Sequence, residues 1–306
     1  GPIRKCIVAA FTLPALFCCT EPDDPVQDGR PMGPYNLSLE MAPQPLEAGR
    51  KTNLTFRLTH KRQDAPVHDL QMVHERIIHN FIVNLDFSSF AHIHHEDFRR
   101  LTQTDLDNGS FHFPYTFPKE GRYRIVSEFA HLNRSWTKHF DIQVGAKKTR
   151  KTNGIELSRT QTNGDYVASL SVSPEIPIAG LETNFVLHLK QGDQPVTDLN
   201  LHLGSELHGA TWRDDGRYFG HLHSHTPKIA AILNLAHDRS EETKTRGARI
   251  QEMLVQLMCL PAELVFHGPA IPMLYVFPAP GRYHLFLQVA PAGKPSVFHF
   301  AVDVAT

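Results

Sequence analysis

The sequence has very little cysteine outside its first residues. Of four cysteines in 306 residues, three lie within the first 19 positions, and Cys259 stands alone in the rest of the chain. A disulfide needs two cysteines that can meet, so no internal disulfide is expected. The same scarcity excludes a CxxC motif and a type-1 copper site, which binds its metal through a cysteine thiolate. The sequence also lacks a Ser/His/Asp order and a Gly-rich phosphate loop.

A basic excess and a long apolar run are missing as well. The net charge of −1 gives no basic surface for a phosphate backbone, so nucleic acid is not an expected partner. The apolar run 6–17 is too short to span a bilayer, and with Arg4 and Lys5 before it, it is typical of an export signal. Residues 1–32 are therefore expected to be a signal or lipoprotein-type leader and linker, with Cys18 or Cys19 as the lipidated residue. The protein would then lie in the periplasm or cell envelope, or be secreted, and contact a membrane only through that lipid.

The sequence does contain an internal repeat. "LSLEMAPQPLEAGRKTNLTFRL" from Leu37 resembles "ASLSVSPEIPIAGLETNFVLHL" from Ala168, and "YTFPKEGRYRIVSEF" resembles "YVFPAPGRYHLFLQV". A self-similarity of this length indicates two copies of one domain. We place the first domain at 33–146, a polar linker at 147–154 and the second domain at 155–306.

Short alternating segments separated by Pro, Gly and Asp turns predict the fold of each copy. This pattern is typical of an antiparallel β-sandwich, so the chain is expected to be all-β with two tandem sandwiches. The second copy carries an insertion at about 226–266 in which apolar residues recur at helical spacing, as in Ile250, Met253 and Leu254. We expect a helical insertion packed on the second sandwich.

Histidine is abundant, with 20 residues, and one arrangement of it occurs in both copies. The spacing H-x12-H-x-H gives two sets of candidate metal ligands: His79, His92 and His94 in the first domain, and His208, His221 and His223 in the second. Folding each hairpin back brings the three imidazoles of a set together, and we expect them to point into their own sandwich core. Buried imidazoles need partners for their nitrogens, and a transition metal satisfies all three at once. Several other histidines are expected at the surface or in loops, among them His95 and His131.

The repeated motifs "VHERIIHNFIVNLDFSSFAHIH", "FPKEGRY", "FGHLH" and "FPAPGRY" resemble those of exported bacterial proteins with YtkA-like or FixH-like domains. The resemblance implies immunoglobulin-like or cupredoxin-like sandwiches, an envelope location and the binding of copper or another heavy metal. The chain departs from the family's pattern at Ile78, where Met often precedes the histidine, so a thioether ligand is in doubt there. It departs again at His95 and Ser224, where proline commonly follows H-x-H.

These observations leave three hypotheses about function. The first is an exported protein for metal storage, resistance or delivery, with one independent metal site per domain and another envelope protein as its delivery partner. Copper is the expected metal because it binds nitrogen ligands most tightly, and zinc is the alternative. The second is an adhesion or protein-interaction module whose histidines are structural. The third is a metal-dependent enzyme, which would need a carboxylate beside the metal; Glu96, Asp97, Asp214 and Asp215 are near the histidines but not at equivalent positions.

Overall fold

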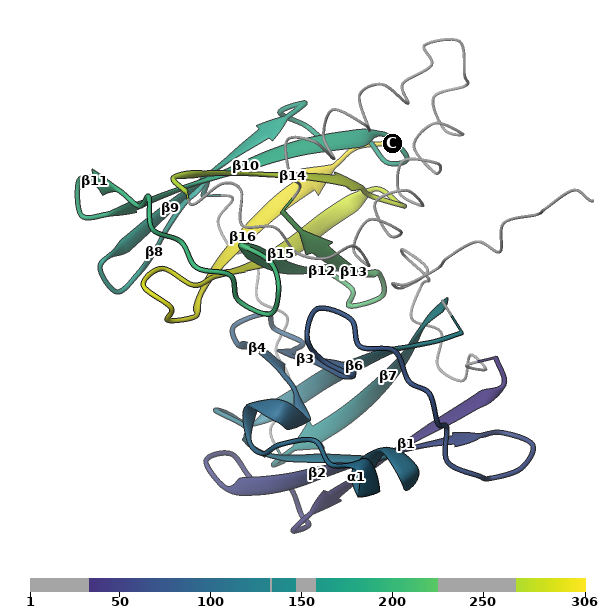
Figure 1. Ribbon diagram of the computed structural model, residues 1–306. Helices are drawn as coiled ribbons and strands as arrows, with labels where there is room; N and C mark the ends of the chain where they lie inside the picture. Colours follow the sequence, from purple (N-terminus) through teal and green to yellow (C-terminus); the bar gives the residue numbers. More distant parts are fainter. Residues whose placement is uncertain (1–32, 133, 147–157, 225–267) are drawn as a thin grey trace, which may run out of the picture.

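The computed structural model describes residues 33–132, 134–146, 158–224 and 268–306 (Figure 1). The predicted leader, the linker and the insertion at 226–266 lie outside these residues. The described residues form two β-sandwiches that follow one another along the chain, and the predicted all-β fold class is confirmed.

The first sandwich has seven strands in two antiparallel sheets. The three-stranded sheet has the order β1-β2-β5, and the four-stranded sheet has the order β4-β3-β6-β7. A 3-10 turn and a short helix connect β4 to β5. The elements are β1 (Tyr35–Ala42), β2 (Lys51–His60), β3 (Ile78–Asn84), β4 (Phe90–Ile93), η1 (His95–Asp97), α1 (Gln103–Asp107), β5 (Ser110–Thr116), β6 (Gly121–His131) and β7 (Arg134–Val144).

The second sandwich repeats this plan. One sheet has the order β11-β10-β9-β8, with β14 also paired to β10, on the edge that β11 uses, and the other sheet has the order β13-β12-β15-β16. The elements are β8 (Thr160–Asn163), β9 (Tyr166–Ser173), β10 (Glu182–Gln191), β11 (Gln194–Pro195), β12 (Leu207–Arg213), β13 (Phe219–His223), β14 (Ala270–Val276), β15 (Gly281–Val289) and β16 (Ser296–Val304). The strands that carry the histidine sets are therefore equivalent: β3 and β4 in one sandwich, β12 and β13 in the other.

Both sandwiches contain a tyrosine corner, a feature of immunoglobulin-like folds. The hydroxyl of Tyr123 donates to the carbonyl of Lys119 at 2.9 Å, and the hydroxyl of Tyr283 donates to the carbonyl of Ala279 at 2.9 Å. Each tyrosine follows the glycine of an F-P-x-x-G-R-Y turn, and this glycine has a φ of +134°, which residues with a side chain rarely adopt. The two corners explain why this motif is present in both copies.

The two sandwiches pack against each other through their four-stranded sheets, and Figure 1 shows β12 and β13 facing β3 and β6. Every residue of β3 is buried, because one face of the strand packs on its own core and the other faces the second sandwich. A separate apolar cluster fills this interface. Residues at equivalent positions of the two repeats contribute to it from the two sandwiches. Its buried members are Phe81, Val83, Phe87 and Val126 from the first sandwich and Ala210, Trp212, Phe219 and Phe286 from the second.

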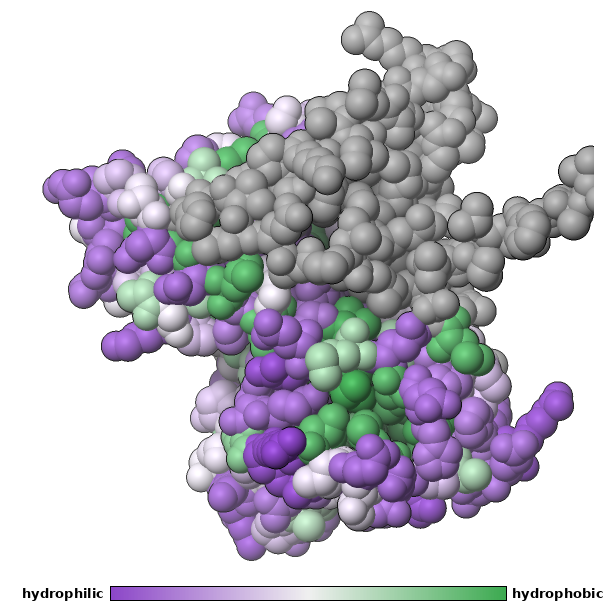
Figure 2. Space-filling view, in the orientation of Figure 1, coloured by the Kyte–Doolittle hydropathy of each residue, from purple (hydrophilic) through white to green (hydrophobic). Residues whose placement is uncertain are grey.

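The outer surface differs from this interface. Hydrophilic residues cover most of the visible surface of the described residues, and hydrophobic residues gather on part of the first sandwich (Figure 2). Met72, Phe98 and Leu132 are exposed large apolar side chains of that sandwich. Among the described residues, no helix is long and apolar enough to cross a membrane. The two histidine sets lie away from this surface, in the buried interface.

Candidate metal centre

The hairpins of the two four-stranded sheets position the histidines. In β3, Ile78 and Ile82 contact the core of the first sandwich, whereas His79 lies on the same side of the strand as Phe81. The neighbouring strand β4 pairs Phe81 with His92, and His94 follows two residues later. In the second sandwich β12 and β13 pair His208 directly with His223. All six predicted histidines are buried, with exposed fractions of 7% or less.

The structure corrects the predicted direction of these side chains. The sequence led us to expect that each set would point into its own sandwich, because His79 and His208 share a strand face with large apolar residues. That face instead packs against the other sandwich, and the apolar residues on it form the interface cluster. The prediction was wrong because a strand covered on both sides carries apolar residues on both faces, so alternation alone does not identify the core side.

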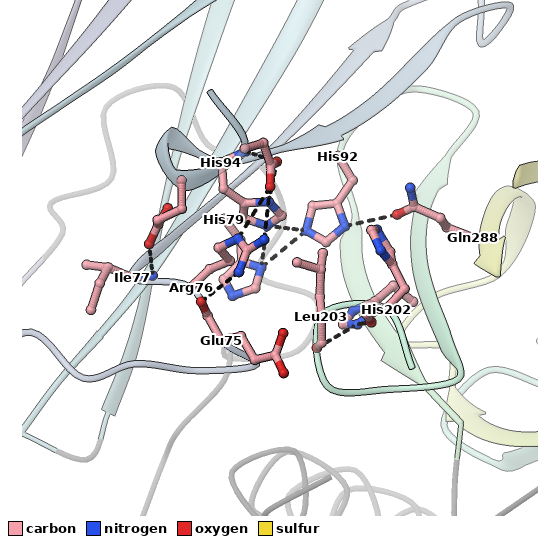
Figure 3. A network of polar contacts seen from close by, with 12 residues as sticks. Glu75, Arg76, Ile77, His79, His92, His94, His202, Leu203 and Gln288 are labelled. Carbon is pink, nitrogen blue, oxygen red and sulfur yellow. Dashed lines mark hydrogen bonds and ion pairs between the residues drawn. The ribbon is translucent and has the colours of Figure 1, made fainter. Parts of the chain in front are cut away.

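The first triad, which consists of His79, His92 and His94, forms a nearly equilateral triangle of ring nitrogens (Figure 3). The distance from His79 Nδ1 to His92 Nε2 is 3.2 Å, and His94 Nε2 is 3.1 Å from both of these atoms. Three imidazole nitrogens bound to one Zn²⁺ at about 2.0–2.1 Å lie about 3.1–3.4 Å apart when the bond angles are near tetrahedral. The first triad therefore already has the spacing of a three-histidine metal site.

In each ring of a triad, the nitrogen that faces the other two rings is the inner nitrogen, and the remaining ring nitrogen is the outer nitrogen. In the first triad each outer nitrogen lies beside a hydrogen-bond acceptor. His79 Nε2 donates to the Val73 carbonyl at 2.9 Å, and His94 Nδ1 donates to Asp97 Oδ2 at 2.9 Å. His92 Nδ1 lies 3.4 Å from Gln288 Oε1, an amide oxygen of the second sandwich that can only accept. A neutral imidazole has one N–H, so these three bonds leave a lone pair on each of the nitrogens that face one another. The same outer bonds are typical of histidines that bind a metal.

The second triad, His208, His221 and His223, is built in the same way but is less complete. His208 Nε2 donates to the carbonyls of His202 at 2.8 Å and Leu203 at 3.0 Å, which leaves a lone pair on His208 Nδ1, 2.9 Å from His223 Nε2. His221 Nδ1 donates to Glu128 Oε2 of the first sandwich at 3.2 Å. His221 Nε2 and His223 Nδ1 are buried and have no hydrogen-bond partner within the part of the chain that the structure describes. The three candidate ligand atoms lie within 4.8 Å of one another.

The two triads are neighbours across the interface. The ring centroids of His92 and His208 are 5.6 Å apart, and those of His92 and His221 are 5.8 Å apart. These distances between triads are comparable to the 5.4 Å between His79 and His92 within one triad. The expectation that the two sets lie in separate cores is therefore wrong, because the triads meet in one buried cluster.

Burial favours the neutral form of five of these imidazoles, those of His79, His92, His94, His208 and His223. It lowers the pKa of His79 and of His92 well below the ordinary value, and the positive charge that neighbouring histidines would carry lowers it further. Burial likewise lowers the pKa of His208 and of His223, with His74 as the next contributor. For Asp97, burial alone would raise the pKa, but hydrogen bonds from His94 and Arg76 lower it to about 2. The site thus combines neutral nitrogen ligands with an ionised carboxylate behind one of them.

Several residues of the site were not identified from the sequence. Glu128 and Gln288 were missed because they lie on β6 and β15, far from the histidines in sequence. The sequence does show that they are equivalent positions, because each follows the glycine of its F-P-x-x-G-R-Y turn by seven residues. His74 was missed as well, because the second copy has no histidine at the matching position; its ring stacks on His223 with centroids 4.1 Å apart.

Two histidines that were expected at the surface or in loops are buried. His95, in the short turn η1, accepts a hydrogen bond at Nδ1 from the His112 amide at 3.0 Å, and His131 pairs with the Tyr35 hydroxyl at 2.5 Å. Both rings make their hydrogen bonds away from the triads, so neither joins the metal candidates.

The carboxylates that the sequence placed near the triads are engaged elsewhere. Asp97 contacts the outer nitrogen of His94 and Arg76, and Glu96 accepts from the Ile77 amide at 3.2 Å. Asp214 contacts His284 at 2.6 Å, and Asp215 contacts Arg213. Within the described ranges, none of these four carboxylates hydrogen bonds to a nitrogen that faces the centre of a triad.

A family model described as a domain of unknown function (DUF8832) matches residues 32–146 and 160–306. No curated protein matches the chain significantly. The match covers more than half of the chain and includes both histidine triads.

Solved structures with some similarity include bacterial surface proteins. The Escherichia coli adhesin FdeC is 11% identical, with 91% of this chain and 66% of that chain covered and a TM-score of 0.22. The Yersinia pseudotuberculosis adhesin InvE is 9% identical, with 90% and 61% covered and a TM-score of 0.25. A Salmonella alpha-2-macroglobulin mutant is 12% identical, with 90% and 15% covered and a TM-score of 0.26. This chain spans two thirds or less of each of these chains, and such low TM-scores support no inference about function.

Proposed function

We propose that this chain, which belongs to the DUF8832 family, binds transition-metal ions through its two histidine triads. The observation that carries the proposal is the first triad, where three neutral imidazoles direct lone pairs at one another from 3.1 to 3.2 Å. Three acceptors facing each other in a buried space repel and lack donors, which costs free energy. A metal ion between them removes both penalties.

The ligand type supports copper first and zinc second. Imidazole suits both ions, and Cu²⁺ binds a given nitrogen site more tightly than the other divalent first-row metals. Three histidines leave ligand positions open, which allows an ion to be taken up and passed on. We therefore propose a role in metal storage, resistance or delivery, with another envelope protein as the recipient.

An interaction module with structural histidines is the competing hypothesis. It requires that the six imidazoles satisfy one another without an ion. Within the described residues, the inner nitrogen His221 Nε2 has no hydrogen-bond partner, and the outer acceptors of the first triad leave no proton for an N–H···N bond inside it. This hypothesis predicts a protein that binds no metal.

Titration of the metal-free protein with Cu²⁺ and with Zn²⁺ by calorimetry tests the proposal. The protein is purified without a histidine tag and stripped with a chelator. We expect about two ions bound by the wild type and fewer after replacement of His92 and His94, or of His221 and His223, by Ala. The control replaces two exposed histidines, His68 in the first sandwich and His188 in the second, and should bind as the wild type does. Equal metal binding by the wild type and by a variant with all six triad histidines replaced would refute the proposal.

A further inference from the structure

One histidine of each triad is held by the opposite sandwich. His92 of the first sandwich has its outer nitrogen against Gln288 on β15, and His221 of the second has its outer nitrogen against Glu128 on β6. Figure 3 shows His92 between its triad partners on one side and Gln288 on the other. Each triad therefore takes one of its hydrogen-bond acceptors from across the interface.

The two acceptors occupy the same position in the repeat. In the pairing of β3 with β6, Glu128 lies opposite His79, and in the pairing of β12 with β15, Gln288 lies opposite His208. Each acceptor thus sits beside the first histidine of its own triad, yet it contacts the second histidine of the other triad. Both side chains are buried, with exposed fractions of 3% for Glu128 and 8% for Gln288. The exchange is reciprocal, as in the interface of a symmetric dimer.

We propose that the two triads form one cross-domain centre, in which Glu128 positions His221 and Gln288 positions His92. The proposal rests on the proposed metal binding and adds the residues that set the affinity of each triad. An acceptor on the outer nitrogen fixes the tautomer and the ring orientation and makes the inner nitrogen a better ligand. Because these acceptors come from the opposite sandwich, each triad is complete only while the two sandwiches are paired.

The two acceptors that cross the interface differ in charge, because Gln288 has a neutral amide and Glu128 has a carboxylate. The first triad has its carboxylate in Asp97 and takes a neutral amide from Gln288, whereas the second takes its carboxylate from Glu128. The hydroxyl of Ser135 donates to the other oxygen of Glu128 at 3.2 Å, so the carboxylate is held from both sides. Each triad therefore has one carboxylate and at least one backbone carbonyl as outer acceptors, although the second obtains its carboxylate from its neighbour.

The test isolates one triad at a time in the full chain. Replacement of His221 and His223 by Ala leaves the first triad, and replacement of His92 and His94 by Ala leaves the second. Glu128→Leu and Gln288→Leu are then introduced separately into each background, and Zn²⁺ and Cu²⁺ affinities are measured by competition with a chelator of known affinity. Glu128→Leu should weaken the remaining second triad by about 10- to 100-fold and leave the first unchanged, and Gln288→Leu should do the reverse.

A conservative variant separates positioning from folding. Glu128→Gln keeps an oxygen acceptor for His221 Nδ1, so it should retain most of the affinity that Glu128→Leu loses. The cross-domain assignment would be overturned if each acceptor variant weakened metal binding by the triad of its own sandwich. It would also be overturned if both variants weakened the two triads equally. Either result would leave the proposed metal binding intact. If the wild type binds no metal, the proposed function fails, and this inference fails with it. Metal that is bound by the wild type but by neither parent background would overturn the assignment of separate triads and leave the proposed function standing.

Discussion

At the scale of single residues, the two triads differ in how firmly their rings are fixed. All three outer nitrogens of the first triad face an acceptor, whereas the outer nitrogen of His223 is buried without a partner in the described residues. A ring without an outer acceptor can adopt either tautomer and is a weaker, less preorganised ligand. We expect the first triad to be the tighter site, and Asp97 is the residue that makes the difference.

Asp97→Ala tests this difference. The substitution removes a carboxylate that accepts from both the backbone amide and the ring of His94, at 2.9 Å each. We expect the affinity of the first triad for Zn²⁺ to fall by about 10- to 100-fold. The matched control is Asp107→Ala in α1, which removes an exposed carboxylate that contacts Gln103 at 2.8 Å, and the Zn²⁺ affinity of this variant should equal that of the wild type. Equal affinities of the two variants would show that Asp97 does not support the site.

Histidines outside the triads make the metal-free protein sensitive to acid. Burial lowers the pKa of His139 to about 3, with Arg124 as the next contributor, and its Nδ1 is buried without a hydrogen-bond partner in the described chain. Between pH 6.5 and 3 the unfolded chain binds a proton at this residue that the folded chain does not. The free energy of unfolding should therefore fall as the pH falls through this window.

His139→Phe measures that contribution. The ring of His139 lies 6.2 Å from that of Phe219 in the interface, so phenylalanine keeps the packing and removes the titration. The variant should show a weaker loss of stability between pH 6.5 and 3 in urea unfolding, by at most about 1.4 kcal/mol per pH unit. The exposed His188→Phe serves as the control and should keep the slope of the wild type. An unchanged slope in His139→Phe would mean that this residue already titrates normally.

At the scale of elements, the hairpin β12–β13 shows what holds the triads in place. Alternate residues of β13 face opposite sides: Phe219 and His221 face the interface, whereas Leu222 packs in the core of the second sandwich. Gly220 also faces that core, and a Cβ added to it would overlap the hydroxyl of Tyr275. The strand lies this close to β14 only because the position has no side chain.

Gly220→Ala should therefore destabilise the hairpin. We expect a loss of about 1–3 kcal/mol in the free energy of unfolding, since the core must move to accept a methyl group. The variant should also weaken metal binding at the second triad, because His221 is the next residue. Ser171→Ala, at an exposed position of strand β9, is the control and should change stability by less than about 0.5 kcal/mol. Wild-type stability of Gly220→Ala in denaturant unfolding would show that β13 is not packed as described.

The same elements show how much the sequence could predict. Alternation and turn residues predicted the sandwiches, and the H-x12-H-x-H spacing correctly brought each set of histidines together, because hairpin pairing is local. The covering of β3 and β12 by a second domain was not predictable, since Phe81 and Ile82 are equally apolar and only one faces its own core. Glu128 and Gln288 escaped prediction for the same reason: their role depends on a contact between domains.

At the scale of the whole molecule, the interface has approximate two-fold character. The exchange of Glu128 and Gln288 has a counterpart elsewhere in the interface. There Arg124 donates to the carbonyl of Gly216, and His284 stacks on Phe87 with ring centroids 3.9 Å apart. Arg124 and His284 each follow the turn glycine by three residues, so they are also equivalent positions. A duplicated domain has paired with its own copy, and the histidines lie in the contact between them.

Metal binding should consequently stabilise the whole two-domain unit. An ion that binds only the folded, paired state adds about 2.7 kcal/mol to the free energy of unfolding when its free concentration is 100 times Kd. Thermal unfolding followed by calorimetry should show a higher Tm with Zn²⁺, and the shift should shrink when either triad is removed. A Zn²⁺-dependent shift that persists without all six histidines would locate the stabilising ion elsewhere.

X-ray absorption of the loaded protein tests the central claim most directly, because it reports the ligands of the ion itself. The claim is that each ion is held by three imidazoles at the contact between the sandwiches. With about one Zn²⁺ bound per triad, the spectrum should give a first shell of nitrogen or oxygen at about 2.0–2.1 Å with the outer-shell scattering of about three imidazoles per ion. A first shell of oxygen ligands without imidazole scattering, or one containing sulfur at about 2.3 Å, would contradict the account.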